Sequence, residues 1–126
     1  MPHENDVIFQ YTRKQAIEDG VLVDVTKRAR ECGFKCPVAV TAQLWADVIA
    51  VDEKAKSAGQ SETGRLWDLL WVLYVRIVAA PVSPELLFYT ILVHDGVRQR
   101  QTQVKAVCGP GDAGEPVVTI MMPDED

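Results

Sequence analysis

Histidine and cysteine are scarce in this sequence, and the few that occur are poorly placed for catalysis or metal binding. The 126 residues include two histidines and three cysteines. Cys32 and Cys36 have the spacing of half a zinc site, but no second pair exists, and Cys108 and His94 could join them only through tertiary proximity. An odd number of cysteines without a framework pattern is typical of a reducing compartment. We therefore predict free thiols, no metal, no cofactor and a cytoplasmic protein.

Long hydrophobic runs are also missing, although a membrane-spanning helix needs about 20 apolar residues. Arg65, Asp68 and Arg76 interrupt or border the longest apolar stretch. The N-terminus has neither the basic nor the apolar region of a signal peptide. The net charge of −5 argues against direct nucleic-acid binding and suits a protein partner with a basic surface. The same charge is also common in proteins where it serves only solubility, which is the interpretation we favour. We predict no membrane association.

The remaining composition is that of one globular domain, with 48% hydrophobic and 25% charged residues. We predict a single domain over residues 1–126, with flexible ends at 1–6 and 123–126. The expected fold class is α+β, with two short and two long helices packed on a three-stranded antiparallel sheet formed by the C-terminal third.

Local signals position these elements. Thr12 and Gln15 form a capping box at the start of the first helix, and glycines close the two short helices. The predicted helices cover residues 13–19, 26–33, a stretch that begins near Thr41, and 62–79. The predicted strands cover residues 86–93, 102–107 and 117–122, with further β-prone segments at 7–11 and 21–25.

The helix predicted over residues 62–79 is apolar on almost every side, which predicts burial on most sides. We accordingly expect Trp45, Trp67 and Trp71 to belong to the core, and any that is exposed to be a candidate interface residue.

From Gly64 onward, the only charges within that helix are Arg65, Asp68 and Arg76, which fall within an arc of roughly 80° and form one ridge. Arg65 and Asp68 have the spacing of a helical ion pair. One interpretation of the ridge is an internal ion pair with Asp24 or another acidic residue. The other is a cleft that binds an anion, a nucleotide or a carboxylate of a partner.

Three segments together resemble a known family. They are D-G-V-L-V-D at residues 19–24, G-R-L-W-D at 64–68 and K-A-V-C-G-P-G-D at 105–112. They resemble small proteins of unknown function that bacterial plasmids, phages and related mobile elements carry. The resemblance implies no activity. Its context implies an antagonist of a host defence system, such as restriction or CRISPR.

Two functions remain as hypotheses. The leading one is a non-enzymatic protein-binding module whose acidic groups engage a basic surface; the candidates are Asp47, Asp52, Glu53, Asp112, Glu115 and the C-terminal tail. The alternative is a small enzyme or nucleotide- or anion-binding domain, in which Arg65 holds an anionic group and Asp24 or Asp68 orients it or acts as a base. A homo-oligomer formed through helices or a strand edge is also left open.

Overall fold

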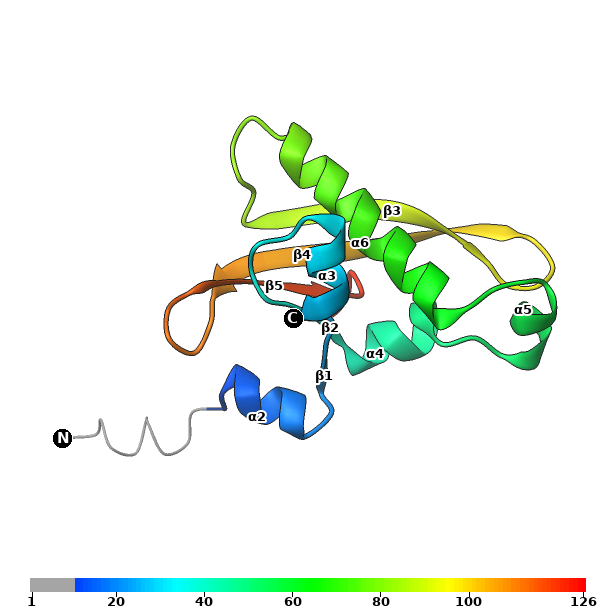
Figure 1. The fold of residues 1–126 in the computed structure, drawn as a ribbon, viewed down its shortest axis with the longest axis horizontal. Coiled ribbons are helices and arrows are strands. Elements are labelled where there is room, and N and C mark those ends of the chain that lie inside the picture. The colour runs from blue at the N-terminus through cyan, green and yellow to red at the C-terminus, as the bar shows by residue number, and fades with distance from the viewer. Residues whose placement is uncertain (1–10) are drawn as a thin grey trace.

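The computed structural model describes residues 11–126, which form an α+β fold (Figure 1). The predictions for the first six residues and for the β-prone segment that begins at Val7 fall on residues outside this range, apart from Tyr11. In chain order the elements are α2 (Arg13–Glu18), β1 (Leu22–Asp24), α3 (Thr26–Cys32), β2 (Val38–Thr41), α4 (Ala42–Leu44), the π-helical turn η1 (Trp45–Ile49), α5 (Glu53–Ser57), α6 (Glu62–Ala79), β3 (Leu86–His94), β4 (Gln99–Pro110) and β5 (Pro116–Met121).

The strands form one mixed sheet in the order β1-β2-β5-β4-β3. The predicted antiparallel arrangement of β3, β4 and β5 is confirmed, but the prediction of a three-stranded sheet is wrong. β5 also pairs in parallel with β2, with Val38 opposite Val118, and β2 pairs with β1 in antiparallel fashion. β2 is a run of four residues of which three are buried, so it lacks the polar–apolar alternation that identifies a half-exposed strand.

The two short helices are confirmed. Thr12 and Gln15 form the predicted capping box at α2, and Gly33 ends α3 with a φ of 122°. Thr26 is the first residue of α3, and its hydroxyl donates to Asp24 Oδ1 and accepts from the N–H of Val38. The connection between α3 and β2 is therefore tied to β1.

The long helix predicted from Thr41 is broken. α4 passes into η1, whose i→i+5 geometry brings the N–H of Ala50 within 2.8 Å of the Trp45 carbonyl. The chain is then extended at Ala50, and Asp52 caps the separate helix α5 by accepting from the N–H of Ala55 at 2.8 Å. A π-turn shifts the residues that follow it out of the 3.6-residue helical period. The sequence did not predict this turn, because the apolar residues from Leu44 to Val51 also fit one face of a continuous helix.

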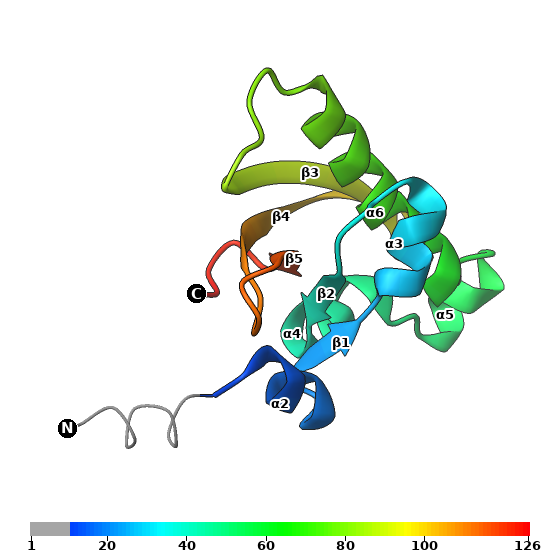
Figure 2. The ribbon, with the colours of Figure 1, turned by 60° about the vertical axis from the view of Figure 1, so that its left-hand side comes forward.

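α6 has the bounds that the sequence predicted, and it lies on the same side of the sheet as α3 (Figure 2). Its inner face packs against the sheet and contributes four buried leucines to the core: Leu66, Leu69, Leu70 and Leu73. The Tyr89 hydroxyl on β3 donates to the Leu69 carbonyl at 3.0 Å. The apolar face of α6 is therefore fixed on β3 and β4, and the core lies between these layers.

The prediction that α6 is buried on most sides is wrong, because no element among residues 11–126 covers its outer face. Trp67 and Trp71 are 41% and 44% exposed, and Val75 and Val78 are exposed as well. Trp45 is half-buried against the core. Two of the three tryptophans predicted for the core thus lie on the surface.

The C-terminal residues lie against the sheet. Glu125 Oε2 accepts hydrogen bonds from the Thr41 hydroxyl and the Met122 N–H, both at 2.7 Å, and Lys105 Nζ donates to the Glu125 carbonyl. The tail, expected to be solvated, therefore contributes backbone and side-chain contacts to β2 and β4. Its mobility stays a prediction.

Candidate functional site

Arg65 is the only charged residue in the described part of the chain that is buried, with 8% of its surface exposed. Its Nη1 donates to the carbonyl of Ala50 at 2.7 Å and lies 3.4 Å from that of Val48, and its Nη2 donates to the carbonyl of His94 at 2.6 Å. The guanidinium thus satisfies carbonyls where η1 ends and where β3 ends. Only Nε lacks a partner within the described residues. Arg65 acts as a clamp between α6, η1 and β3.

This geometry differs from the internal ion pair that the sequence suggested for the charged ridge, whereas the cleft interpretation stays a prediction. No salt bridge joins Arg65 to Asp68 or Asp24 within residues 11–126, and its partners are backbone carbonyls. Asp68 and Arg76 are exposed on α6. Partial burial raises the pKa of the Asp68 carboxyl, and no salt bridge among residues 11–126 involves this group. The predicted ridge therefore divides into one buried structural residue and two surface charges.

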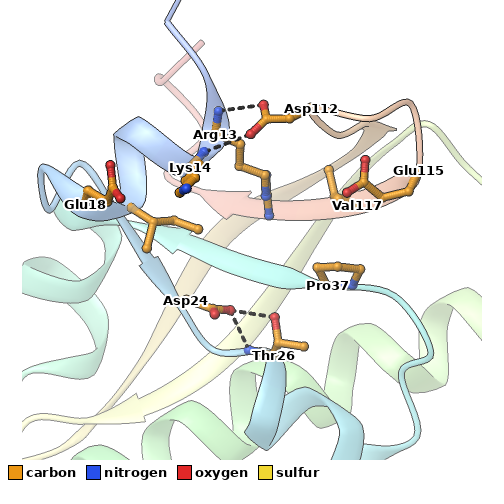
Figure 3. A pocket seen from close by; sticks show the side chains of 10 residues that line it. Arg13, Lys14, Glu18, Asp24, Thr26, Pro37, Asp112, Glu115 and Val117 are labelled. Atoms are coloured by element: carbon orange, nitrogen blue, oxygen red, sulfur yellow. Dashed lines mark hydrogen bonds between the residues drawn. The ribbon is translucent and has the colours of Figure 1, made fainter.

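Asp24 lines a different hollow, of about 250 Å³, between α2, β1 and the β4–β5 loop (Figure 3). Its Oδ1 accepts from the N–H and the hydroxyl of Thr26. Asp24 therefore orders the start of α3, and it does not share a cleft with Arg65.

Two further charged side chains of this hollow, those of Arg13 and Asp112, form hydrogen bonds with neighbouring elements. Asp112 accepts from the backbone N–H groups of Arg13 and Lys14, at 2.8 and 3.0 Å, so the β4–β5 loop caps α2 (Figure 3). The Arg13 side chain donates to Thr119 Oγ1 at 2.6 Å and to the Val118 carbonyl at 2.9 Å. These bonds attach α2 to β5 and to the β4–β5 loop. The contacts between these elements therefore account for the Arg13 and Asp112 side chains in the hollow.

The five acidic interface candidates fall into two groups at opposite ends of the molecule. Asp47, Asp52 and Glu53 lie on η1 and around α5, whereas Asp112 and Glu115 lie in the β4–β5 loop (Figure 1). Asp47 and Asp52 share one hollow with Arg65, at the N-terminal end of α6. The structure thus does not join all five candidates into one surface.

The outer face of α6 carries a surface that we call the aromatic ridge, made of Trp67, Trp71, Tyr74, Val75 and Val78. The rings of Trp67 and Trp71 are nearly parallel, with centroids 6.0 Å apart and an interplanar angle of 6°, and Tyr74 continues the stack at 5.8 Å. Tyr74 also meets Phe34 edge-on, which ties the ridge to the end of α3. Stacking orders these rings before any partner is bound.

A hollow of about 370 Å³ opens beside the first residue of the ridge. Trp67 forms its apolar wall, and Asp68, Ser61 and Thr63 contribute polar groups. Arg65 also lines this hollow, but its guanidinium donates to backbone carbonyls. An indole face next to a carboxylate that forms no salt bridge among residues 11–126 is a suitable environment for a cationic side chain. The sequence does contain a signal for this site, namely the adjacent Trp67 and Asp68 of the G-R-L-W-D segment. It was not recognised because Trp67 was predicted to be buried.

The cysteines and His94 do not converge. His94 ends β3 beside Gln99, whereas Cys108 lies at the opposite end of the β3–β4 hairpin, so the pairing considered from the sequence is not formed. Cys36 and Cys108 line an apolar hollow of about 330 Å³ near Tyr74. Within the part of the chain that the structure describes, no three His, Cys, Asp or Glu residues gather as metal ligands. Nor is any helix there long and apolar enough to cross a membrane.

Comparison with known proteins gives a family but no activity. No curated protein and no solved structure matches this chain. A family model, however, matches residues 2–126. The chain therefore belongs to the family of unknown function DUF6573.

Proposed function

We propose that this protein is a non-enzymatic protein-binding module that uses the aromatic ridge of α6 to hold a partner whose apolar surface is bordered by basic side chains. The observation that carries the proposal is the ordered, exposed stack of Trp67 and Trp71 on a helix whose opposite face is already fully packed. Tryptophan is the residue type most enriched among those that dominate binding energy at protein interfaces. Folding alone gives no reason to expose two of them.

The charges around the ridge support a basic partner. Asp68 lies on the same turn as Trp67, is partly desolvated and forms no salt bridge with any residue among 11–126. An arginine or lysine from the partner would stack on the indole and pair with this carboxylate. Asp47 and Asp52 lie at the same end of α6 and extend the negative surface. Asp112 and Glu115 lie at the other end of the molecule and are outside the proposed interface.

The enzymatic alternative receives no comparable support. It requires Arg65 to present its guanidinium to an anion, but both Nη atoms donate to backbone carbonyls. A narrower hypothesis is part of the same proposal: the partner belongs to a defence complex of the host cell that a mobile element enters. This hypothesis rests on the sequence resemblance.

In the first step of the test, the immobilised protein is exposed to a lysate of the cells that express this chain, and the proteins that it retains are identified by mass spectrometry. The retained partner is then purified and its affinity measured by calorimetry for wild type, Trp71→Ala and Asp68→Asn. Loss of a central tryptophan is expected to weaken binding roughly 30-fold. Asp68→Asn is expected to weaken it less and to reduce its dependence on salt.

The matched control is Val97→Ala, which shortens an exposed apolar side chain in the β3–β4 turn, away from the ridge. It should leave affinity unchanged. A partner that binds the Trp71→Ala and control variants equally well, while circular dichroism shows both to be folded, contradicts the assignment of the ridge. Identification of the partner as a restriction or CRISPR component, or as neither, decides the narrower hypothesis.

A further inference from the structure

β3 is an edge strand with features that usually promote strand pairing. It is nine residues long, lies at one end of the sheet order, and no residue among 11–126 pairs with its outer edge. From Leu86 to Val93 it carries no charge and no proline. Soluble proteins usually protect long edges with lysine, proline or a bulge, and β3 has none of these. Its outer edge therefore suits a further strand.

The hydrogen-bond phase of β3 identifies which backbone groups are free. The N–H of Cys108 donates to the Glu85 carbonyl at 2.8 Å, and this pair continues the β3–β4 register, in which Leu86 lies opposite Val107. In an antiparallel ladder, hydrogen-bonded and non-hydrogen-bonded pairs alternate. The odd-numbered residues of β3 therefore bond to β4, and the even-numbered residues direct N–H and C=O groups outward. These are Leu86, Phe88, Thr90, Leu92 and His94.

The same alternation places the odd-numbered and even-numbered side chains of β3 on opposite faces of the sheet. Tyr89 and Ile91 are buried under α6, whereas Leu86, Phe88 and Leu92 are exposed on the other face of the sheet. On that other face, α2 contacts β5 through Arg13, and the C-terminal residues contact Thr41 of β2 and Lys105 of β4 through Glu125. Three of the five residues with outward backbone groups, Leu86, Phe88 and Leu92, thus also carry exposed apolar side chains.

We propose that β3 pairs with β3 of a second copy of this chain, antiparallel and centred on Thr90, so that two five-stranded sheets join into one. The strand is self-complementary in this register. Thr90 faces Thr90 of the second copy, and Phe88 faces Leu92 of the second copy, all through outward backbone groups. The pairing occupies the unused donors and acceptors of β3 and brings the exposed apolar side chains of both copies together on one face.

The charges beside the strand permit this pairing. Glu85 would face Asp95 of the second copy, but Asp95 already accepts from Arg100 Nε at 2.5 Å, so Glu85 meets a neutralised pair. A heterologous strand could use the same edge, but it would have to provide its own matching apolar pattern. A second copy supplies that pattern without any further component.

The decisive experiment is sedimentation equilibrium on wild type and on Thr90→Pro at concentrations up to about 100 μM. Wild type is expected to approach twice the 14.0 kDa mass of one chain. Because the Thr90 N–H points away from β4, proline there blocks the new pairing and leaves the existing ladder intact. Thr90→Pro should shift the dissociation constant at least about tenfold. Phe88→Lys should do the same, and Val97→Lys, in the neighbouring turn, should not.

Hydrogen exchange supplies a second measurement, independent of whether Thr90→Pro folds well. In the wild-type dimer, the amides of Phe88, Thr90 and Leu92 should be protected and lose protection on dilution, whereas those of Tyr89 and Ile91 stay protected throughout. A wild-type chain that remains at 14.0 kDa overturns the proposal. So does a dimer in which Phe88→Lys has no effect, since its interface must lie elsewhere. Neither result bears on the partner-binding assay of the aromatic ridge.

Discussion

Replacing Arg65 by methionine tests whether this residue is a structural clamp or a ligand-binding group. The substitution keeps a long side chain but removes two short charge-assisted hydrogen bonds, to the carbonyls of Ala50 and His94. Such bonds contribute about 1.5–3 kcal/mol each. The gain from burying an apolar side chain offsets part of that loss. We expect a net loss of about 3 kcal/mol, a large share of the ~10 kcal/mol typical of a domain of this size.

The measurement is urea denaturation followed by circular dichroism, with Arg76→Met as the matched control on the same helix. Arg76 is exposed, so its replacement should change the free energy of unfolding by less than about 0.5 kcal/mol. Backbone carbonyls do not titrate, so the difference between wild type and Arg65→Met should be the same at about pH 7 and about pH 4. An ion pair with a carboxylate would lose its contribution as the pH falls. A loss no larger than that of the control, or one that shrinks in acid, refutes the clamp.

Three further predictions concern other parts of the fold. Gly33→Ala should destabilise the protein by about 1–3 kcal/mol, because φ is 122° and the new Cβ would lie 2.7 Å from the ring of Tyr74. Gly59→Ala is the control: φ is 89° there, but the new Cβ would meet open space, so the loss of stability should be smaller. The thermal unfolding temperatures of the two variants test this difference. Backbone N–H donors at α2 hold the pKa of Asp112 below its usual value, so its contribution is complete above the unfolded pKa of about 3.9 and is lost as pH falls through the folded pKa. Asp112→Asn should therefore flatten the acid side of a plot of urea midpoint against pH, and an unchanged slope would contradict the cap. Burial raises the pKa of the Cys36 and Cys108 thiols, so at neutral pH iodoacetamide should modify them far more slowly in the native protein than in urea, as mass spectrometry would detect.

The sequence was most informative where local signals determine structure. The capping box at Thr12, the glycine after α3 and the 62–79 helix depend on contacts within a few residues, and all three are confirmed. β2 depends on a partner strand far along the chain, and its four residues carry no periodicity of their own. The burial of α6 also depends on distant elements. An apolar outer face predicts that some other element packs on it, but the pattern does not show which element does so or whether one does.

The candidate site shows the same limit. The sequence placed Arg65, Asp68 and Arg76 on one side of a helix, and that placement follows from helical geometry alone. Which of them is buried depends on where η1 and β3 end, because those carbonyls are the partners of Arg65. The exposure of Trp67 and Trp71 was likewise inaccessible without the positions of the neighbouring layers.

The parallel pairing of β5 with β2 makes the whole architecture depend on six residues. β5 is hydrogen-bonded to β2 on one side and to β4 on the other, and no other strand in the sheet order joins the two halves. Without β5, the sheet separates into the ribbons β1–β2 and β3–β4, and isolated two-stranded ribbons are marginally stable in water. Assembly should therefore be all-or-none, with the early and late parts of the chain stable only together. A cut anywhere in the β4–β5 loop should release no stable fragment.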